Sequence, residues 1–228
     1  MMRLDRLRGA GIALSMLVAL APLGCLDEGA SSQAICVLID VSGTYADEKD
    51  EVVKVIKREV LPNMIPGDTL ITILIDSASY EKDNLETLAT LDPRPSRANA
   101  QKLALAQQLD AFARGDTRSR YTDIPGAMML AAEYLQEAES GSRVMLVFSD
   151  LQEDLPEGAR RNMREDEFAG IEVVAMNVKR LERDTVDPDV FRRRLEGWRA
   201  RVEHAGGKGW RTVMDPSKLP GLLEQMRS

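Results

Sequence analysis

Histidine and cysteine are scarce in this sequence. Among 228 residues there is one histidine, His204, and there are two cysteines, Cys25 and Cys36. So few sulfur and imidazole ligands exclude a Cys/His zinc cage and leave at most one Ser/His/Asp arrangement. No glycine-rich loop followed by lysine is present, which argues against a nucleotide hydrolase. Much catalytic chemistry is therefore excluded.

An excess of positive charge is also lacking. The chain has 30 Lys and Arg residues against 37 Asp and Glu residues, which gives a formal net charge of -7. Nucleic-acid binding depends on the neutralisation of phosphates, so an acidic chain is poorly suited to it, whereas a cation is a more suitable ligand. With 44% hydrophobic and 29% charged residues, the composition is that of a soluble globular domain.

Residues 1–24 have the features of an export signal. Arg3, Arg6 and Arg8 precede an apolar stretch over residues 12–23, which is shorter than the ~20 residues of a membrane-spanning helix. The stretch ends in Gly24 and Cys25, and it resembles the lipobox of bacterial lipoproteins. The resemblance implies a signal peptide over 1–24, a lipid on Cys25, a short polar tether over 25–32 and a place in the bacterial cell envelope, facing the periplasm or the cell surface. Ordinary signal-peptidase cleavage, with Cys25 left as a free thiol, is the alternative.

Residues 33–228 alternate between two hydrophobic patterns, which indicates a single α/β domain. Apolar, β-branched runs predict buried strands at 35–39, 70–75, 144–148 and 171–178. Helical periodicity separates these runs at 47–60, 97–114 and 124–139, and continues at 191–202 and 219–226. Residues 84–91 and 210–214 predict two edge strands, the first antiparallel. We therefore expect a doubly wound, mostly parallel central sheet with one antiparallel edge strand and helices on both faces.

Oxygen-bearing side chains follow three of these predicted elements. Asp40, Ser42 and Thr44 follow the first strand at alternate positions, Thr122 opens a later helix, and Asp150 follows the strand at 144–148. Ligands of open α/β sheets bind beyond the carboxyl ends of the strands, so these groups are expected to meet there. Hydroxyl and carboxylate oxygens without sulfur or imidazole favour a hard cation such as Mg²⁺, with Mn²⁺ or Ca²⁺ as alternatives.

This constellation resembles the metal-ion-dependent adhesion site (MIDAS) of von Willebrand factor A (VWA) domains, whose fold is Rossmann-like. The resemblance covers residues 33–226 and implies that Asp40, Ser42, Thr44, Thr122 and Asp150 form a metal site. It further implies that a protein partner completes the coordination with an Asp or Glu carboxylate, and that the domain binds this partner without being an enzyme.

Other interpretations of the same residues are open. Ser42 and Thr44 are also suited to cap the next helix, and Asp150 to form a turn. Asp123 is a rival ligand to Thr122. The metal site could also be vestigial, in a structural scaffold.

Two further hypotheses concern the surroundings of the site. Arg118, Arg120 and Tyr121 precede Thr122 and are candidates for a rim that attracts an acidic partner, although a plain solvated loop is an equal alternative. A second candidate function is Mg²⁺-dependent phosphoryl transfer with Asp40 as nucleophile. That chemistry needs a second aspartate as general acid, and Ser42 stands at its position.

Overall fold

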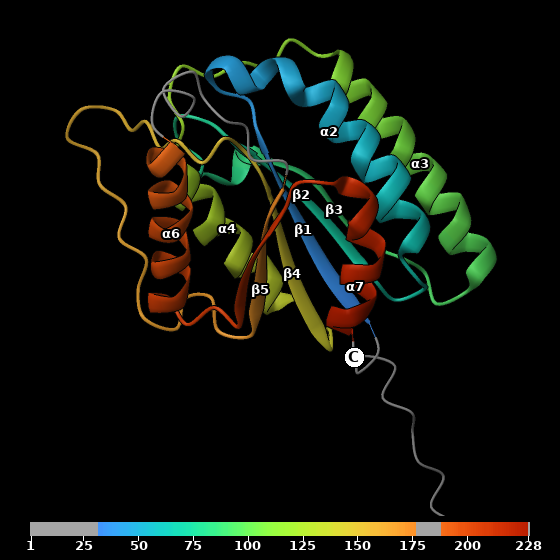
Figure 1. The fold of residues 1–228 in the computed structure, drawn as a ribbon. Coiled ribbons are helices and arrows are strands. Elements are labelled where there is room, and N and C mark those ends of the chain that lie inside the picture. Colours follow the sequence, from blue (N-terminus) through green and yellow to red (C-terminus); the bar gives the residue numbers. More distant parts are fainter. Residues whose placement is uncertain (1–31, 177–187, 228) are drawn as a thin grey trace, which may run out of the picture.

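A computed structural model of the chain describes residues 32–176 and 188–227 (Figure 1). The predicted signal peptide, Cys25 and the last two positions of the predicted strand at 171–178 lie outside these ranges. Within them, no helix is both long enough and apolar enough to cross a bilayer.

A six-stranded sheet forms the centre of the molecule. Its strands run in the order β3-β2-β1-β4-β5-β6, and every neighbouring pair is parallel except β2 and β3. The bounds are β1 Gln33–Asp40, β2 Thr69–Ile75, β3 Leu85–Thr90, β4 Ser142–Phe148, β5 Ile171–Met176 and β6 Gly209–Val213. The predicted doubly wound sheet with one antiparallel edge strand is therefore confirmed.

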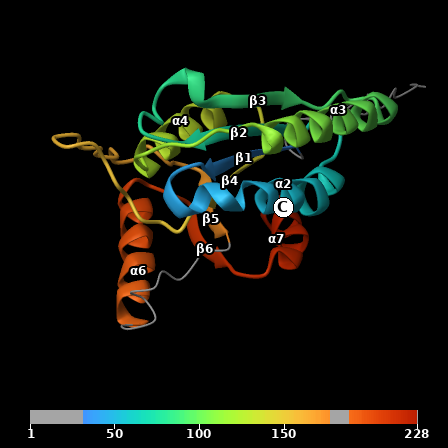
Figure 2. The same cartoon turned by 90° about the horizontal axis from the view of Figure 1, so that it is seen from above.

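Helices cover both faces of this sheet (Figures 1 and 2). The main helices are α2 Lys49–Val55, α3 Pro95–Arg114, α4 Ile124–Glu137, α6 Pro188–His204 and α7 Leu219–Arg227. Helices α2, α3 and α7 pack on one face and α4 and α6 on the other. Strand alternation explains this division on β1, where Ile35 and Ile39 point to the first face and Cys36 and Leu38 to the second.

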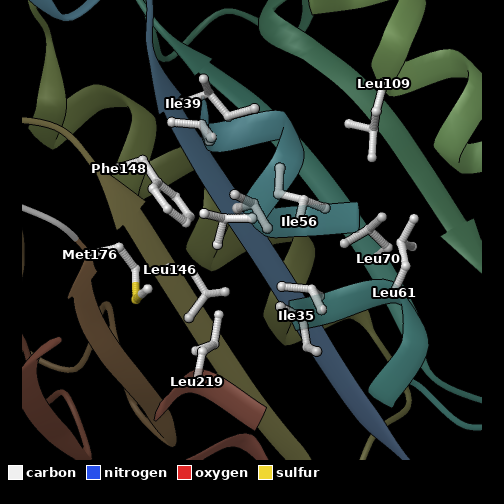
Figure 3. Packing of buried hydrophobic residues seen from close by; sticks show 14 of the residues in the cluster. Ile35, Ile39, Ile56, Leu61, Leu70, Leu109, Leu146, Phe148, Met176 and Leu219 are labelled. Carbon is white, nitrogen blue, oxygen red and sulfur yellow. The ribbon is translucent and has the colours of Figure 1, made fainter. Parts of the chain in front are cut away.

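Figure 3 shows the packing on the first face, where Ile35, Ile39 and Phe148 of the sheet meet Ile56 and Leu219. All five side chains are at most 1% exposed. Side chains of both β1 and β4 therefore contribute to the core on this face.

Cys36 is buried on the second face of the sheet. Burial raises the pKa of its thiol far above the ordinary value, because the thiolate would lose its hydration.

The predicted helix at 47–60 is less regular than expected. It begins with a 3-10 turn, η1 (Gly43–Glu48), and α2 is followed by a π-helical turn (Ile56–Val60) and a second 3-10 turn (Leu61–Asn63). The wider π turn lies where Ile56, Val60 and Leu61 are all buried, so the packing of this segment overrides regular α-helical geometry.

A buried ion pair joins the C-terminal helix α7 to the start of β2. This place lies at the edge of the sheet opposite the carboxyl ends of its parallel strands. The Arg227 guanidinium donates to both carboxylate oxygens of Asp68, at 2.6 and 2.7 Å. Asp68 is fully buried and also accepts from the backbone N–H groups of Gln33 and Ile65, both at 2.8 Å. The pair therefore links α7, β1 and the start of β2.

Candidate functional site

The candidate site lies at the carboxyl ends of β1 and β4. These strands are sheet neighbours although about a hundred residues separate them, and β1 pairs with β2 on its other side. The chain therefore changes direction across the sheet at this point, which is where ligands bind in doubly wound folds. Asp40 is the last residue of β1, and Ser149 and Asp150 directly follow β4.

Asp40 is the centre of a compact hydrogen-bond network. Its Oδ1 accepts from the backbone N–H and the hydroxyl of Ser42, at 2.9 and 2.5 Å, and its Oδ2 accepts from the Ser149 hydroxyl at 2.6 Å. The hydroxyls of Ser42 and Thr122 are themselves 2.5 Å apart. Three of the five predicted metal-site residues, Asp40, Ser42 and Thr122, therefore meet, and all three are buried.

The loop between α3 and α4 brings Thr122 to this network. The N–H of Ser119 donates to Val41 O at 2.8 Å, which attaches the loop to the end of β1. The N–H of Thr122 donates to Asp154 O at 2.7 Å, and the N–H of Asp123 donates to Asp76 O at 2.7 Å. Backbone contacts to three separate segments therefore set the position of Thr122.

Asp123 has a structural role, so its prediction as a rival ligand is not supported. One of its oxygens accepts from Gly126 N at 2.9 Å, which caps the N-terminus of α4, and the other accepts from Arg161 Nε at 2.9 Å. A Cβ atom on Gly126 would lie 2.4 Å from Asp123 Oδ2, so the cap requires glycine here. The Asp123 carboxylate therefore already has a cationic partner, Arg161, within the fold.

Asp150 lies beside Asp40 and is half-buried. Its negative charge is one of the groups that raise the pKa of Asp40, and its Oδ1 accepts from Gln152 N at 2.8 Å. The turn predicted as an alternative for Asp150 is therefore present, and it leaves the residue at the edge of the Asp40 network.

The residue after Asp150 has an unusual backbone. Leu151 has a φ of 61° and is 2% exposed, a conformation that costs free energy in a residue with a Cβ atom. The Ser149 hydroxyl accepts from Leu151 N at 3.0 Å, and the indole N–H of Trp198 donates to Leu151 O at 2.9 Å. These contacts hold the turn that carries Asp150.

The remaining predicted residues lie in the next turn and on the surface. Thr44 belongs to η1. Arg118 forms an exposed ion pair with Asp47 at 2.7 Å, and the Arg120 guanidinium lies 5.2 Å from the ring centre of Tyr121. The loop before Thr122 therefore presents two arginines at the surface.

The helix-capping interpretation is wrong for Ser42. Ser42 occupies the N-cap position of η1, but its side chain makes no capping hydrogen bond. The hydroxyl is instead engaged with Asp40 and Thr122, because the backbone turns Ser42 into the network.

Burial controls the electrostatics of the network. It raises the pKa of Asp40 to about 6, because the hydrogen bonds from Ser149 and Ser42, which favour the carboxylate, only partly offset the loss of hydration. The nearby charge of Asp150 raises it further. Burial also raises the pKa of Tyr45, and the charge of Asp40 adds to this effect. Among the described residues, no lysine or arginine forms an ion pair with Asp40.

The possible metal ligands at this site include both carboxylate and hydroxyl oxygens. Over 32–176 and 188–227, no group of three or more His, Cys, Asp or Glu side chains is placed to hold a metal ion. The network instead joins the Asp40 carboxylate to the hydroxyls of Ser42, Thr122 and Ser149, and the charge of Asp150 acts on Asp40 from nearby. Such a set suits a hard cation better than zinc or copper.

No protein-family model and no curated protein matches this chain. Similarity to solved structures is found. A minor pilin, PilB, from Streptococcus sanguinis, solved as a D319A mutant, superposes with a TM-score of 0.53 at 8% identity, over 86% of this chain and 60% of the pilin. At that identity the similarity concerns the fold alone.

Two further structures are similar at lower scores. An aerotolerance-related membrane protein from Bacteroides fragilis has a TM-score of 0.48 at 14% identity, over 86% of this chain and 98% of its own. A von Willebrand factor type A protein from Catenulispora acidiphila has a TM-score of 0.45 at 12% identity, over 86% and 42%. The strand order, the antiparallel β3 and the helices on both faces confirm the doubly wound fold that the resemblance to VWA domains implied.

Proposed function

We propose that this chain is an exported, lipid-anchored VWA-like domain that binds a protein partner through a divalent cation. The metal site comprises Asp40, Ser42, Thr44, Thr122 and Asp150. One observation carries the proposal: the Ser42 and Thr122 hydroxyls, 80 residues apart in the chain, lie 2.5 Å from each other beside Asp40. Two hydroxyl oxygens brought together from distant segments could act as neighbouring ligands of one cation, which would replace the hydrogen bond between them.

The donor chemistry supports Mg²⁺, with Mn²⁺ or Ca²⁺ as alternatives. Hydroxyl oxygens are neutral, so Ser42 and Thr122 would leave most of the charge of the ion uncompensated. Asp40 and Asp150 supply negative charge beside them. An Asp or Glu carboxylate from the partner is the complementary ligand, and binding of this kind needs no bond-breaking step.

The buried charge of Asp40 is the strongest electrostatic support. An ionised carboxylate at 1% exposure needs a counter-charge, yet no described lysine or arginine pairs with it. Its hydrogen bonds to Ser42 and Ser149 offset only part of this cost, since its pKa is still raised. A divalent cation next to Asp40 would supply the missing positive charge.

Arg118, Arg120 and Tyr121 form the proposed partner-binding rim. They lie on the loop that positions Thr122, and both arginines are exposed. Positive charge beside the metal would attract an acidic partner and orient its carboxylate toward the ion.

The proposed location in the cell envelope rests on residues 1–32, which precede the folded domain. The proposed lipid on Cys25 would be separated from β1 by the tether 25–32, which even fully extended spans roughly 30 Å. The domain would therefore work close to its membrane, on the periplasmic or surface side.

The phosphoryl-transfer alternative is disfavoured by the same network. Its chemistry needs a second acid beside the nucleophile Asp40, whereas Ser42 stands there and its hydroxyl contacts Asp40 and Thr122. A scaffold with a vestigial site differs from the proposal in a measurable way, because it would not respond to a divalent ion.

Thermal unfolding with and without Mg²⁺ tests the metal site. At a Mg²⁺ concentration about 100 times Kd, a single site stabilises a protein by about 2.7 kcal/mol, which corresponds to roughly 5 to 11 °C in a domain of this size. Ser42→Ala should abolish this shift. Ser96→Ala, on the exposed first turn of α3, should retain it. A wild-type melting temperature unchanged by Mg²⁺, Mn²⁺ and Ca²⁺ would contradict the metal site.

Capture from a detergent extract of the envelope tests partner binding. The wild type and Ser96→Ala should retain a common partner in Mg²⁺ and release it in chelator, while Ser42→Ala should not retain it. A partner retained equally by all three proteins, or in chelator, would show that binding does not pass through the metal.

A further inference from the structure

The outer edge of β3 is a second surface with the features of a binding site. β3 is the antiparallel edge strand of the sheet and pairs with β2 only (Figure 2). Over the described ranges, no other strand pairs with its outer side. An edge strand in this position presents unpaired N–H and C=O groups to any extended segment.

The hydrogen-bond phase of β3 identifies the outward groups. Leu91 N donates to Asp68 O at 2.8 Å, so the N–H of Leu91 faces β2. Donor directions alternate along an antiparallel strand, which turns the N–H groups of Leu88 and Thr90 away from β2. A register shift between Thr72 and Ile73 disturbs the ladder only beyond Thr87. The stretch 87–90 is therefore regular, and no strand pairs with the outward N–H groups of Leu88 and Thr90, although Thr90 O accepts from Gln101 Nε2 of α3 at 3.2 Å.

Two grooves flank this stretch, one on each face of the sheet. The larger, about 440 Å³, lies on the α4 side and includes Leu88 and Tyr134 among its lining residues. The smaller, about 280 Å³, lies on the α3 side, where Leu109 and Phe112 form an apolar wall. A strand added to β3 would direct alternate side chains to opposite faces, and each face offers a groove.

The charges around the grooves indicate the chemistry of the occupant. Glu137 and Glu139 line the α4-side groove and Glu86 lines the α3-side groove. All three are exposed, and no lysine or arginine is among the described residues that line either groove. Leu88 is 54% exposed, so the α4-side groove combines an apolar surface with acidic ends. This combination fits the aliphatic stem and cationic head of arginine or lysine.

The α3-side groove has a different character. Thr72 lines it and is fully buried, and its hydroxyl oxygen has no hydrogen-bond partner among the described residues. With Leu109 and Phe112 beside it, this groove suits a small apolar or hydroxyl-bearing side chain such as valine or threonine.

We infer that β3 binds an extended segment of a partner protein by strand addition, with basic side chains on the α4 face and small side chains on the α3 face. A second copy of this chain is disfavoured as the occupant, because its own β3 would bring Glu86, Glu137 and Glu139 against the same acidic residues. The inference is independent of the proposed metal site, which lies at the carboxyl ends of β1 and β4.

A labelled peptide in which arginine alternates with valine tests the inference, because strand geometry places all its arginines on one face. Fluorescence anisotropy with the full-length chain in detergent should show saturable binding that chelator does not change. The double variant Glu137→Lys/Glu139→Lys should weaken binding by about tenfold or more. Its matched control, Glu196→Lys/Glu203→Lys on the exposed side of α6, should keep the wild-type affinity.

Hydrogen exchange gives a readout that a nonspecific charge attraction would not produce. Bound peptide should slow exchange at Leu88 and Thr90, whereas the same peptide with a central proline should not. No binding of the alternating peptide, equal weakening in both double variants, or unchanged exchange at Leu88 and Thr90 would overturn the inference. A dimer in sedimentation that Leu88→Lys dissociates would assign the edge to a second copy and would also overturn it.

Discussion

Replacement of Asp40 by asparagine should stabilise the metal-free protein at neutral and alkaline pH. Burial raises the pKa of Asp40 from 3.8 to about 6, so the folded protein holds this proton over a range in which the unfolded chain has lost it. In the absence of metal, the free energy of unfolding therefore falls as pH rises from about 4 to about 6. Above that range the destabilisation by the ionised Asp40 is complete. A difference of about two pKa units corresponds to about 3 kcal/mol.

Asparagine preserves the shape of this side chain without its charge. Its Oδ1 can still accept from Ser42, and its amide can donate to the Ser149 hydroxyl. In chelator at pH 8, Asp40→Asn should therefore melt above the wild type by up to about 6 to 12 °C, at 2 to 4 °C for each kcal/mol. At pH 4 the difference should nearly vanish, because the wild-type carboxyl is then protonated in the folded protein. In Mg²⁺ at about 1,000 times Kd the order should reverse, since only the wild type gains stability from the ion, by about 4.1 kcal/mol.

Differential scanning calorimetry across this pH range measures the effect directly. Asp83→Asn, on an exposed turn before β3, is the matched control and should follow the wild type at every pH. The electrostatic account would be refuted if Asp40→Asn were less stable than the wild type in chelator at pH 8, or if its advantage were the same at pH 4 and pH 8.

Four further outcomes are expected. Arg227→Met should lower the free energy of unfolding, measured in urea, by about 3 to 5 kcal/mol, because Asp68 would remain as an unpaired buried charge. Adding Asp68→Asn should restore part of this loss. A decrease of less than about 1 kcal/mol for Arg227→Met would contradict the prediction. Gly126→Ala should destabilise the protein in the same assay although alanine favours helices, since its Cβ would lie 2.4 Å from the Asp123 carboxylate. A gain in stability would show that the Asp123 side chain can move to accommodate the Cβ atom. Trp198→Phe removes the donor to Leu151 O and should reduce the Mg²⁺-dependent shift in melting temperature as well as the stability itself; an unchanged shift would show that Asp150 is positioned without Trp198. Labelled fatty acid should enter the wild type in cells and not Cys25→Ser, whereas incorporation into both would exclude lipidation at Cys25.

Much of the fold could be predicted because its signals are local. Buried parallel strands need continuous apolar, β-branched runs, and the runs before Asp40 and Asp150 predict β1 and β4 correctly. Residues 84–91 follow the second predicted strand after a polar turn, with no helical pattern between them, and this arrangement predicted the antiparallel edge strand β3. Helix ends were less predictable. Proline is favoured in the first turn, so α3 begins at Pro95 rather than at residue 97, and the π turn at Ile56–Val60 depends on packing that the sequence pattern does not encode.

The candidate site was partly predictable. The rule that loops at the carboxyl ends of strands converge anticipated the meeting of Asp40, Ser42 and Thr122. The roles of Ser149 and Asp123 were not anticipated, since a hydroxyl and a carboxylate next to predicted ligands look like ligands themselves in the sequence. The hydrogen-bond partners of Ser149 and Asp123 show their structural roles, and those partners come from distant segments of the chain.

Trp198 illustrates a different limit. In the sequence it is one apolar position on a helical stripe, and only the tertiary structure shows that its indole N–H reaches the backbone of Leu151 beside Asp150. The strained φ of Leu151 has no sequence signal either, because leucine is not a residue that favours this conformation.

Anomalous diffraction from a crystal soaked in Mn²⁺ tests the central claim most directly. The account predicts one strong peak at the carboxyl ends of β1 and β4, about 2.1 to 2.3 Å from the hydroxyl oxygens of Ser42 and Thr122, and the loss of that peak in Ser42→Ala. Mn²⁺ bound only elsewhere, or a peak at the site that persists in Ser42→Ala, would contradict it.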